Sequence, residues 1–147
     1  MSQSILEVMT TSPVALSQSS TVRDAAAAMR EADIGDVVVV DDNGNVCGIV
    51  TDRDVTVRAV AEGLNPSEVR LGEICSKALV TLASTSTVDD AVQLMRQQAL
   101  RRLLVVDSGQ PIGIVSLGDL AITRDPQSVL AGISAAPPNT TRNKLVP

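Results

Sequence analysis

The sequence predicts an α/β (α+β) fold in which two βαββα (strand–helix–strand–strand–helix) units pack sheet to sheet about a pseudo-twofold axis. Two observations predict this fold: the chain contains an internal duplication, and both copies show the same order of local patterns. The chain has 147 residues, of which 44% are hydrophobic. That is enough to bury a core without a metal or a disulfide.

The duplication becomes visible when the sequence is shifted by 66 residues. Residues 21–41 then fall on residues 87–107, with nine of 21 positions identical. After a one-residue deletion, residues 44–55 fall on residues 109–120, with five of 12 identical. The period is longer than that of solenoid repeats and there are only two copies, so we expect each half to cover the apolar face of the other.

Each unit is predicted to begin with a short extended piece followed by an amphipathic helix. Apolar residues at i, i+3, i+4 and i+7 form one stripe that ends at Met29 in the first unit and at Met95 in the second. Thr21 and Thr87, or alternatively Ser20 and Ser86, precede these stripes and are good N-caps. The extended pieces are expected at residues 13–16 and 79–82.

Two further strands and a second helix complete each unit. The first of these strands is valine-rich without apolar–polar alternation, which is typical of a strand buried on both faces. Turn residues separate it from the next strand, and Thr51 or Ser116 then caps the second helix. The predicted strands are residues 37–41 and 46–50 in the first unit, and 103–107 and 112–115 in the second.

The predicted organisation is a first unit (1–62), a linker (63–73), a second unit (74–124) and a flexible C-terminal tail (125–147). Within the linker, Asn65 and Pro66 have the pattern of a helix start. The tail ends in a Pro-, Thr- and Asn-rich stretch without periodicity.

The composition excludes several classes of function. Without His, no His-based triad, general base or metal site can form, and without aromatic residues no base can stack on the protein. A net charge of −5 argues against nucleic acid as a partner. Cys47 and Cys75 are too few for a disulfide scaffold, and we interpret them as small core residues, with a redox pair as the alternative. We expect no enzyme, no catalytic residue and no metal.

No apolar run approaches the length of a membrane span, and the first residues lack the pattern of a signal peptide. We therefore expect a cytoplasmic protein without a membrane partner.

Two equivalent segments carry a resemblance to a known family. GIVTDRD (48–54) and GIVSLGD (113–119) both fit the pattern Gly-h-h-[Thr/Ser]-x-x-Asp, in which h is apolar. Together with the helix and valine strand before each, residues 5–123 resemble a tandem pair of CBS (cystathionine β-synthase) domains, or Bateman module, of the stand-alone bacterial type. The resemblance implies two βαββα units that form a disc, and a homodimer.

The resemblance also implies an adenosine-containing ligand, such as AMP, ADP, ATP or a related adenosyl compound, in two clefts between the halves, with no required cofactor. Asp54 and Asp119 would hold the ribose, since a carboxylate can accept hydrogen bonds from both hydroxyls. Thr51 and Ser116 would touch ribose or phosphate at the positive ends of helices. With no aromatic residue available, adenine would lie between aliphatic side chains such as Val14, Val37, Val80 and Leu103.

The two copies differ at one position that matters for phosphate. Arg102 stands where similar repeats of the family present a phosphate-binding arginine, whereas the equivalent residue of the first copy is Asp36. A carboxylate there repels phosphate unless Arg53 or a residue of the other half compensates. We therefore expect the better phosphoryl site around Arg102, Ser116 and Asp119. The other cleft is expected to be empty or to hold a ligand with less negative charge.

The leading hypothesis is a regulatory module that senses an adenosine-type ligand and signals to an unidentified effector protein in trans. The alternative is a ligand-free structural module for dimerisation or protein interaction. An Asp at the start of a helix commonly serves only as a cap, and a strand-edge Arg commonly faces solvent.

Overall fold

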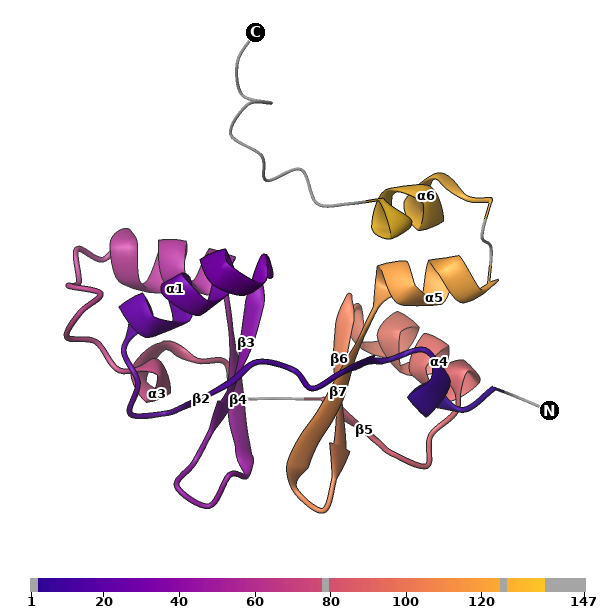
Figure 1. Ribbon diagram of the computed structural model, residues 1–147, viewed down its shortest axis with the longest axis horizontal. Coiled ribbons are helices and arrows are strands. Elements are labelled where there is room, and N and C mark those ends of the chain that lie inside the picture. The colour runs from indigo at the N-terminus through magenta and orange to yellow at the C-terminus, as the bar shows by residue number, and fades with distance from the viewer. Residues whose placement is uncertain (1–2, 78–79, 125–126, 137–147) are drawn as a thin grey trace, which may run out of the picture.

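Two small sheets lie side by side at the centre of the molecule, with helices on the outer sides of both (Figure 1). The computed structural model describes residues 3–77, 80–124 and 127–136. One apolar core lies within each half, between the sheet and its helices. This arrangement confirms the predicted fold of two βαββα units packed sheet to sheet.

The strands and helices follow the same order in both halves. In each half the first strand pairs parallel with the second, and the second pairs antiparallel with the third. The first half consists of β2 (Ala15–Ser17), α1 (Val22–Ala32), β3 (Asp36–Val40), β4 (Val46–Thr51), α2 (Asp52–Asp54) and the π-helical η2 (Val55–Val60). The second half consists of β5 (Thr81–Ala83), α4 (Val88–Gln98), β6 (Arg102–Asp107), β7 (Gln110–Ser116) and α5 (Leu117–Arg124).

The predicted caps and stripes account for the long helices. The Thr21 hydroxyl accepts a hydrogen bond from Asp24 N (3.1 Å), while the Asp24 carboxylate accepts one from Thr21 N (2.9 Å). Thr87 and Asp90 repeat both bonds at the start of α4. Such reciprocal bonds satisfy two backbone donors that the first turn leaves without partners. Three of the four residues of each stripe are buried in the cores, among them Met29 in α1 and Met95 in α4. The i+4 residues differ, since Ala26 is exposed and Val92 is half-buried.

The halves exchange their leading segments. The short strand β1 (Thr10–Thr11) pairs antiparallel with β7 of the second half, and the preceding turn η1 (Ile5–Glu7) places Ile5 in the second core. At the equivalent position of the repeat, Ser76 forms a bridge to Ile49 in β4. The short helix α3 (Leu71–Ile74) is correspondingly buried in the first core. Each core is therefore completed by residues that precede the other unit in sequence.

The exchange explains a wrong local prediction in the linker. No helix begins at Asn65: its side-chain oxygen accepts from Ser67 N and its carbonyl from Val69 N, which closes a single turn. The chain then runs extended until α3 begins at Leu71, because Leu71 must reach the first core.

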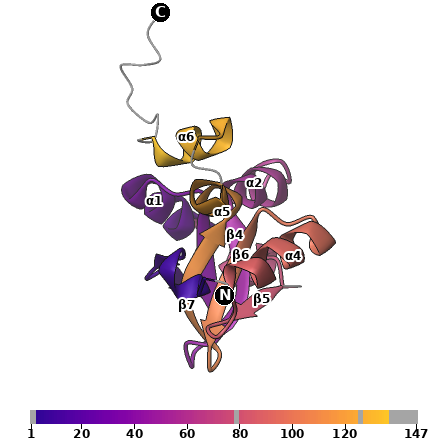
Figure 2. The same cartoon turned by 90° about the vertical axis from the view of Figure 1, so that its right-hand side faces the viewer.

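The predicted flexible tail is also corrected in part. Within it lies α6 (Val129–Ala135), whose first turn is capped by the Ser128 hydroxyl, which accepts from Ala131 N at 3.0 Å. Leu130 and Ala131 are good helix formers, and Ala131 is buried. The helix packs against α5 (Figures 1 and 2). Residues 137–147 lie outside the described part of the chain.

The glycines of the two repeated motifs are required by the exchanged segments. A Cβ atom on Gly48 would lie 2.6 Å from Cys75 Sγ and 3.0 Å from the Ser76 carbonyl oxygen. A Cβ atom on Gly113 would collide with Met9 Sδ and lie 2.9 Å from the Thr10 carbonyl oxygen. The exchanged backbone can approach β4 and β7 only because these two residues have no side chain.

We expect Gly48→Ala to lower the free energy of unfolding by roughly 1–3 kcal/mol, because overpacking displaces the backbone at Ser76. Urea denaturation followed by far-UV circular dichroism measures this change. Gly132→Ala is the matched control, since nothing lies within 4 Å of its Cβ position in helix α6. Cys75→Ala in the Gly48→Ala background should restore part of the stability. Equal stability of Gly48→Ala and the wild type would contradict this account.

The Asp24 cap should give a defined pH dependence. The backbone N–H of Thr21, followed by its hydroxyl, lowers the pKa of Asp24 in the folded protein. A lowered folded pKa stabilises the fold above the unfolded value, near 4, and this stabilisation disappears as the pH falls through the folded pKa. Asp24→Asn should therefore reduce the urea midpoint at pH 7, and the difference from wild type should shrink below about pH 4. A difference that does not depend on pH would contradict the role of the charge.

Candidate functional site

Two clefts open between the halves, and their residues correspond through the repeat. We call them the Asp119 cleft, with a volume of about 340 Å³, and the Thr51 cleft, with about 320 Å³. Val14 in the first corresponds to Val80 in the second, and Ile34 corresponds to Leu100. The Asp119 cleft is lined by Thr10, residues 12–14 and residues 33–36 of the first half, and by Arg102, Ile114, Ser116 and Asp119 of the second.

Strand register brings the polar residues to the clefts. Asp36 at the start of β3 is the pairing partner of Thr51, and Arg102 at the start of β6 is the pairing partner of Ser116. Each charged residue therefore lies beside the hydroxyl that caps the following helix. Asp36, Arg102 and Ile114 line both clefts and form the wall between them.

The shared wall contains an ion pair between equivalent positions of the repeat. Arg102 Nη1 lies 2.7 Å from Asp36 Oδ2, and the side chains are 51% and 14% exposed, respectively. The residue numbers differ by the repeat shift, 102 − 36 = 66. Asp36 was predicted to repel phosphate unless Arg53 or a residue of the other half compensates its charge. The structure shows that Arg102 does so.

Asp119 presents a carboxylate to its cleft from the first turn of α5. One oxygen, Oδ2, accepts a hydrogen bond from Ser116 N at 2.9 Å, and Asp119 N donates to the Ser116 hydroxyl at 3.1 Å. Within residues 3–77, 80–124 and 127–136, no Lys or Arg forms an ion pair with Asp119. Its Oδ1 atom can therefore accept hydrogen bonds from a ligand.

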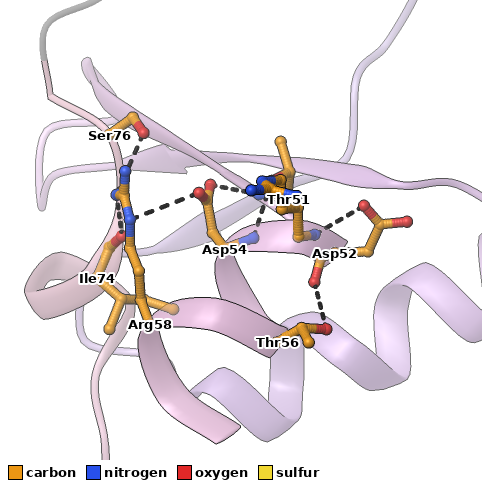
Figure 3. A network of polar contacts seen from close by, with 8 residues as sticks. Thr51, Asp52, Asp54, Thr56, Arg58, Ile74 and Ser76 are labelled. Carbon is orange, nitrogen blue, oxygen red and sulfur yellow. Dashed lines mark hydrogen bonds and ion pairs between the residues drawn. The ribbon is translucent and has the colours of Figure 1, made fainter. Parts of the chain in front are cut away.

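Asp54 has the same cap but different surroundings (Figure 3). Its Oδ2 accepts from Thr51 N at 2.9 Å, while its Oδ1 lies 3.6 Å from Arg58 Nε. Arg58 also donates through Nη1 to the carbonyl of Ile74 at 2.8 Å and to the Ser76 hydroxyl at 3.3 Å. The carboxylate of Asp54 is thus bound to a guanidinium that fixes the exchanged segment. Asp54 does not line the Thr51 cleft.

The predicted aliphatic residues divide between the two clefts. Val14 lines the Asp119 cleft, whereas Val80 and Leu103 line the Thr51 cleft. Val37 lies in the first core and lines neither cleft. Each cleft thus joins an extended piece of one half to the helix start of the other.

Among the residues of the Asp119 cleft that sequence reasoning missed are Asp33, Ile34 and Ile114. Ile34 could have been predicted from the equivalent residue of the second copy, Leu100. Both are apolar and lie shortly before the valine-rich strand. Asp33 ends α1 in a left-handed conformation (φ 59°), which turns the chain toward the cleft.

The two cysteines lie at β4. Burial raises the pKa of the Cys47 thiol, and the thiol donates to the carbonyl of Val39 at 3.4 Å. Cys75 is buried against Gly48. Both thiols are free.

Two features are absent from the described chain, which leaves out residues 1–2, 78–79, 125–126 and 137–147. No cluster of three or more His, Cys, Asp or Glu side chains could hold a metal ion. No helix there is both long and apolar enough to span a membrane.

Known proteins are similar to this chain in both sequence and fold. The CBS domain family matches residues 5–60 and 71–124. The CBS domain-containing protein YhcV of Bacillus subtilis is 36% identical over 121 residues, which cover 82% of this chain and 85% of that protein. Hypoxic response protein 1 of Mycobacterium tuberculosis is 27% identical over 115 residues, which cover 78% of this chain and 80% of that protein.

Solved structures agree with these matches. Hypoxic Response Protein I, solved with two coordinated zinc ions, superimposes with a TM-score of 0.74 at 26% identity, covering 81% of this chain and 97% of that chain. A hexameric CBS-CP12 protein from bloom-forming cyanobacteria gives a TM-score of 0.73 at 29% identity. The match covers 85% of this chain and 74% of that chain. The chain therefore belongs to the CBS domain family and contains two CBS units.

Proposed function

We propose that the protein is a regulatory module that binds an adenosine-containing ligand in the Asp119 cleft. One observation carries this proposal: a carboxylate with an available oxygen faces a cavity of about 340 Å³ that also contains an arginine and aliphatic walls. That combination suits a sugar with two hydroxyls, an anionic group and a flat apolar ring.

The residues suggest one orientation of the ligand. The ribose hydroxyls would donate to Asp119 Oδ1, and adenine would lie between Val14, Ile34 and Ile114. A phosphate would lie toward Ser116, at the start of α5, and toward the Arg102 guanidinium.

Charge in the cleft favours a ligand with few phosphates. Asp33, Asp36 and Asp119 line it, and Arg102 is the one cation among its described lining residues. Because each added phosphate meets more repulsion than attraction, we expect AMP to bind more tightly than ADP, and ADP more tightly than ATP.

Occupancy would be transmitted through the arrangement of the halves. A ligand that touches Val14 of one half and Asp119 of the other stabilises one relative position of the two, and its differential affinity sets the size of the signal. We expect a cytoplasmic homodimer that passes this change to an effector protein in trans. The name of the relative from M. tuberculosis, a response protein, is consistent with such regulation.

One observation favours a second function, that of a ligand-free structural module. Arg102 and Asp54 already have partners within the chain, Asp36 and Arg58 respectively. In that case the clefts have no ligand and the protein acts only through its surface.

A thermal-shift panel separates the two functions. A ligand at 100 times its Kd adds about 2.7 kcal/mol, which for a chain of this size raises the Tm by roughly 5–10 °C. We expect AMP to give such a shift in the wild type, and Asp119→Ala to lose most of it, because the Asp119 cleft then lacks the carboxylate that would hold the ribose. The shift should be largely retained in Asp54→Ala.

Asp54→Ala is a matched control because both variants change the helix cap in the same way. Each loses the 2.9 Å hydrogen bond from the backbone N–H of Thr51 or Ser116 to the carboxylate. Each keeps the 3.1 Å hydrogen bond from its own backbone N–H to the Thr or Ser hydroxyl. Each variant is compared with its own unliganded Tm, so an equal loss of fold stability cancels. Absence of any shift with adenosine, AMP, ADP, ATP, NAD or S-adenosylmethionine at millimolar concentration would sink the sensor proposal and favour the structural module.

Arg102→Gln should separate recognition of phosphate from recognition of adenosine. We expect the affinity for AMP to fall by about tenfold or more, because a charge-assisted hydrogen bond is lost and Asp36 is left unpaired. The affinity for adenosine should change little. Isothermal titration calorimetry measures both values, and an equal loss for the two ligands would contradict a phosphate contact.

A further inference from the structure

Among residues 3–77, 80–124 and 127–136, one cation and one anion belong to the wall between the clefts. Arg102 and Asp36 are the two charged residues that line both the Asp119 cleft and the Thr51 cleft in the described structure. They form an ion pair at 2.7 Å, and the Asp36 side chain is only 14% exposed. Any charged ligand in either cleft therefore acts on the same pair of side chains.

An anion in the Asp119 cleft changes the electrostatics of the Thr51 cleft. Arg102 is half exposed, so its guanidinium can turn from Asp36 toward a phosphate beside Ser116, its pairing partner in β7. Asp36 then loses its counter-charge while it still lines the Thr51 cleft. A poorly hydrated, uncompensated carboxylate disfavours a second anion there.

The reverse order leads to the same conflict. An anion in the Thr51 cleft would lie beside Asp36, the pairing partner of Thr51, and would need Arg102 to remain in place. With both clefts filled, two anions would share one guanidinium in the presence of one carboxylate. A neutral ligand draws on neither charge and meets no such conflict.

We propose that the Asp36–Arg102 pair makes the two clefts mutually exclusive for phosphorylated ligands, while a neutral adenosyl ligand can occupy both. This inference rests on the proposed function. It makes the pair a determinant of both ligand charge and stoichiometry. Each chain would then bind one phosphorylated ligand, although its fold has two equivalent clefts.

Calorimetric titrations with AMP and with adenosine test this inference. The chain contains no Trp or Tyr, so its concentration is best fixed by amino-acid analysis. For the wild type we expect one AMP but two adenosine molecules per chain. For Asp36→Asn we expect two AMP per chain, because the carboxylate that repels the second anion is gone.

Asp33→Asn is the matched control. It removes the same charge from the Asp119 cleft but lies outside the shared wall, and Asn tolerates the left-handed backbone at this position. It should still bind one AMP per chain. Far-UV circular dichroism verifies that both variants fold.

The possible outcomes separate the two proposals. Two AMP per wild-type chain, one adenosine per wild-type chain, or one AMP per Asp36→Asn chain would each overturn mutual exclusion by charge while leaving ligand binding intact. If neither AMP nor adenosine binds to the wild type, the proposed function and this inference fall together.

Discussion

The exchange of leading segments is the constraint on which the rest of the structure depends. Ile5 completes the second core and Leu71 completes the first, so neither half can bury its apolar surface without the other. The exchanged backbone crosses β4 and β7 where Gly48 and Gly113 leave room. Because the extended piece of one half then meets the helix start of the other, both clefts are formed between the halves.

The pseudo-twofold axis imposes a second constraint, on charge. Equivalent positions near such an axis face each other, so an identical charged residue in both copies would place like charges in contact. Here the copies have diverged to Asp36 and Arg102, which attract instead. The same divergence makes the clefts unequal, since each charged residue is paired by register with a different hydroxyl, Thr51 or Ser116.

Local patterns in the sequence were enough to predict the units but not their interlocking. The stripes ending at Met29 and Met95, together with the Thr caps, are local signals, and the structure confirms them. The pairing of Thr10 with Ile114 is not local: nothing in a two-residue strand says which sheet it joins. The grouping of Val14 with Asp119 was missed for the same reason. The Arg58–Asp54 pair, by contrast, has i, i+4 helical spacing and could have been predicted.

The two interpretations of a helix-start Asp, cap and ligand contact, are compatible at this site. A cap engages one carboxylate oxygen: Asp119 and Asp54 both use Oδ2 for it. What distinguishes them is the second oxygen, and that depends on the residue one turn later. In the first half this residue is Arg58, which occupies Oδ1 and anchors the exchanged segment. In the second half it is Thr123, whose hydroxyl donates to the backbone carbonyl of Asp119 and leaves the carboxylate to the cleft. One substitution between the copies thus assigns a structural role to one Asp and makes the other available for binding.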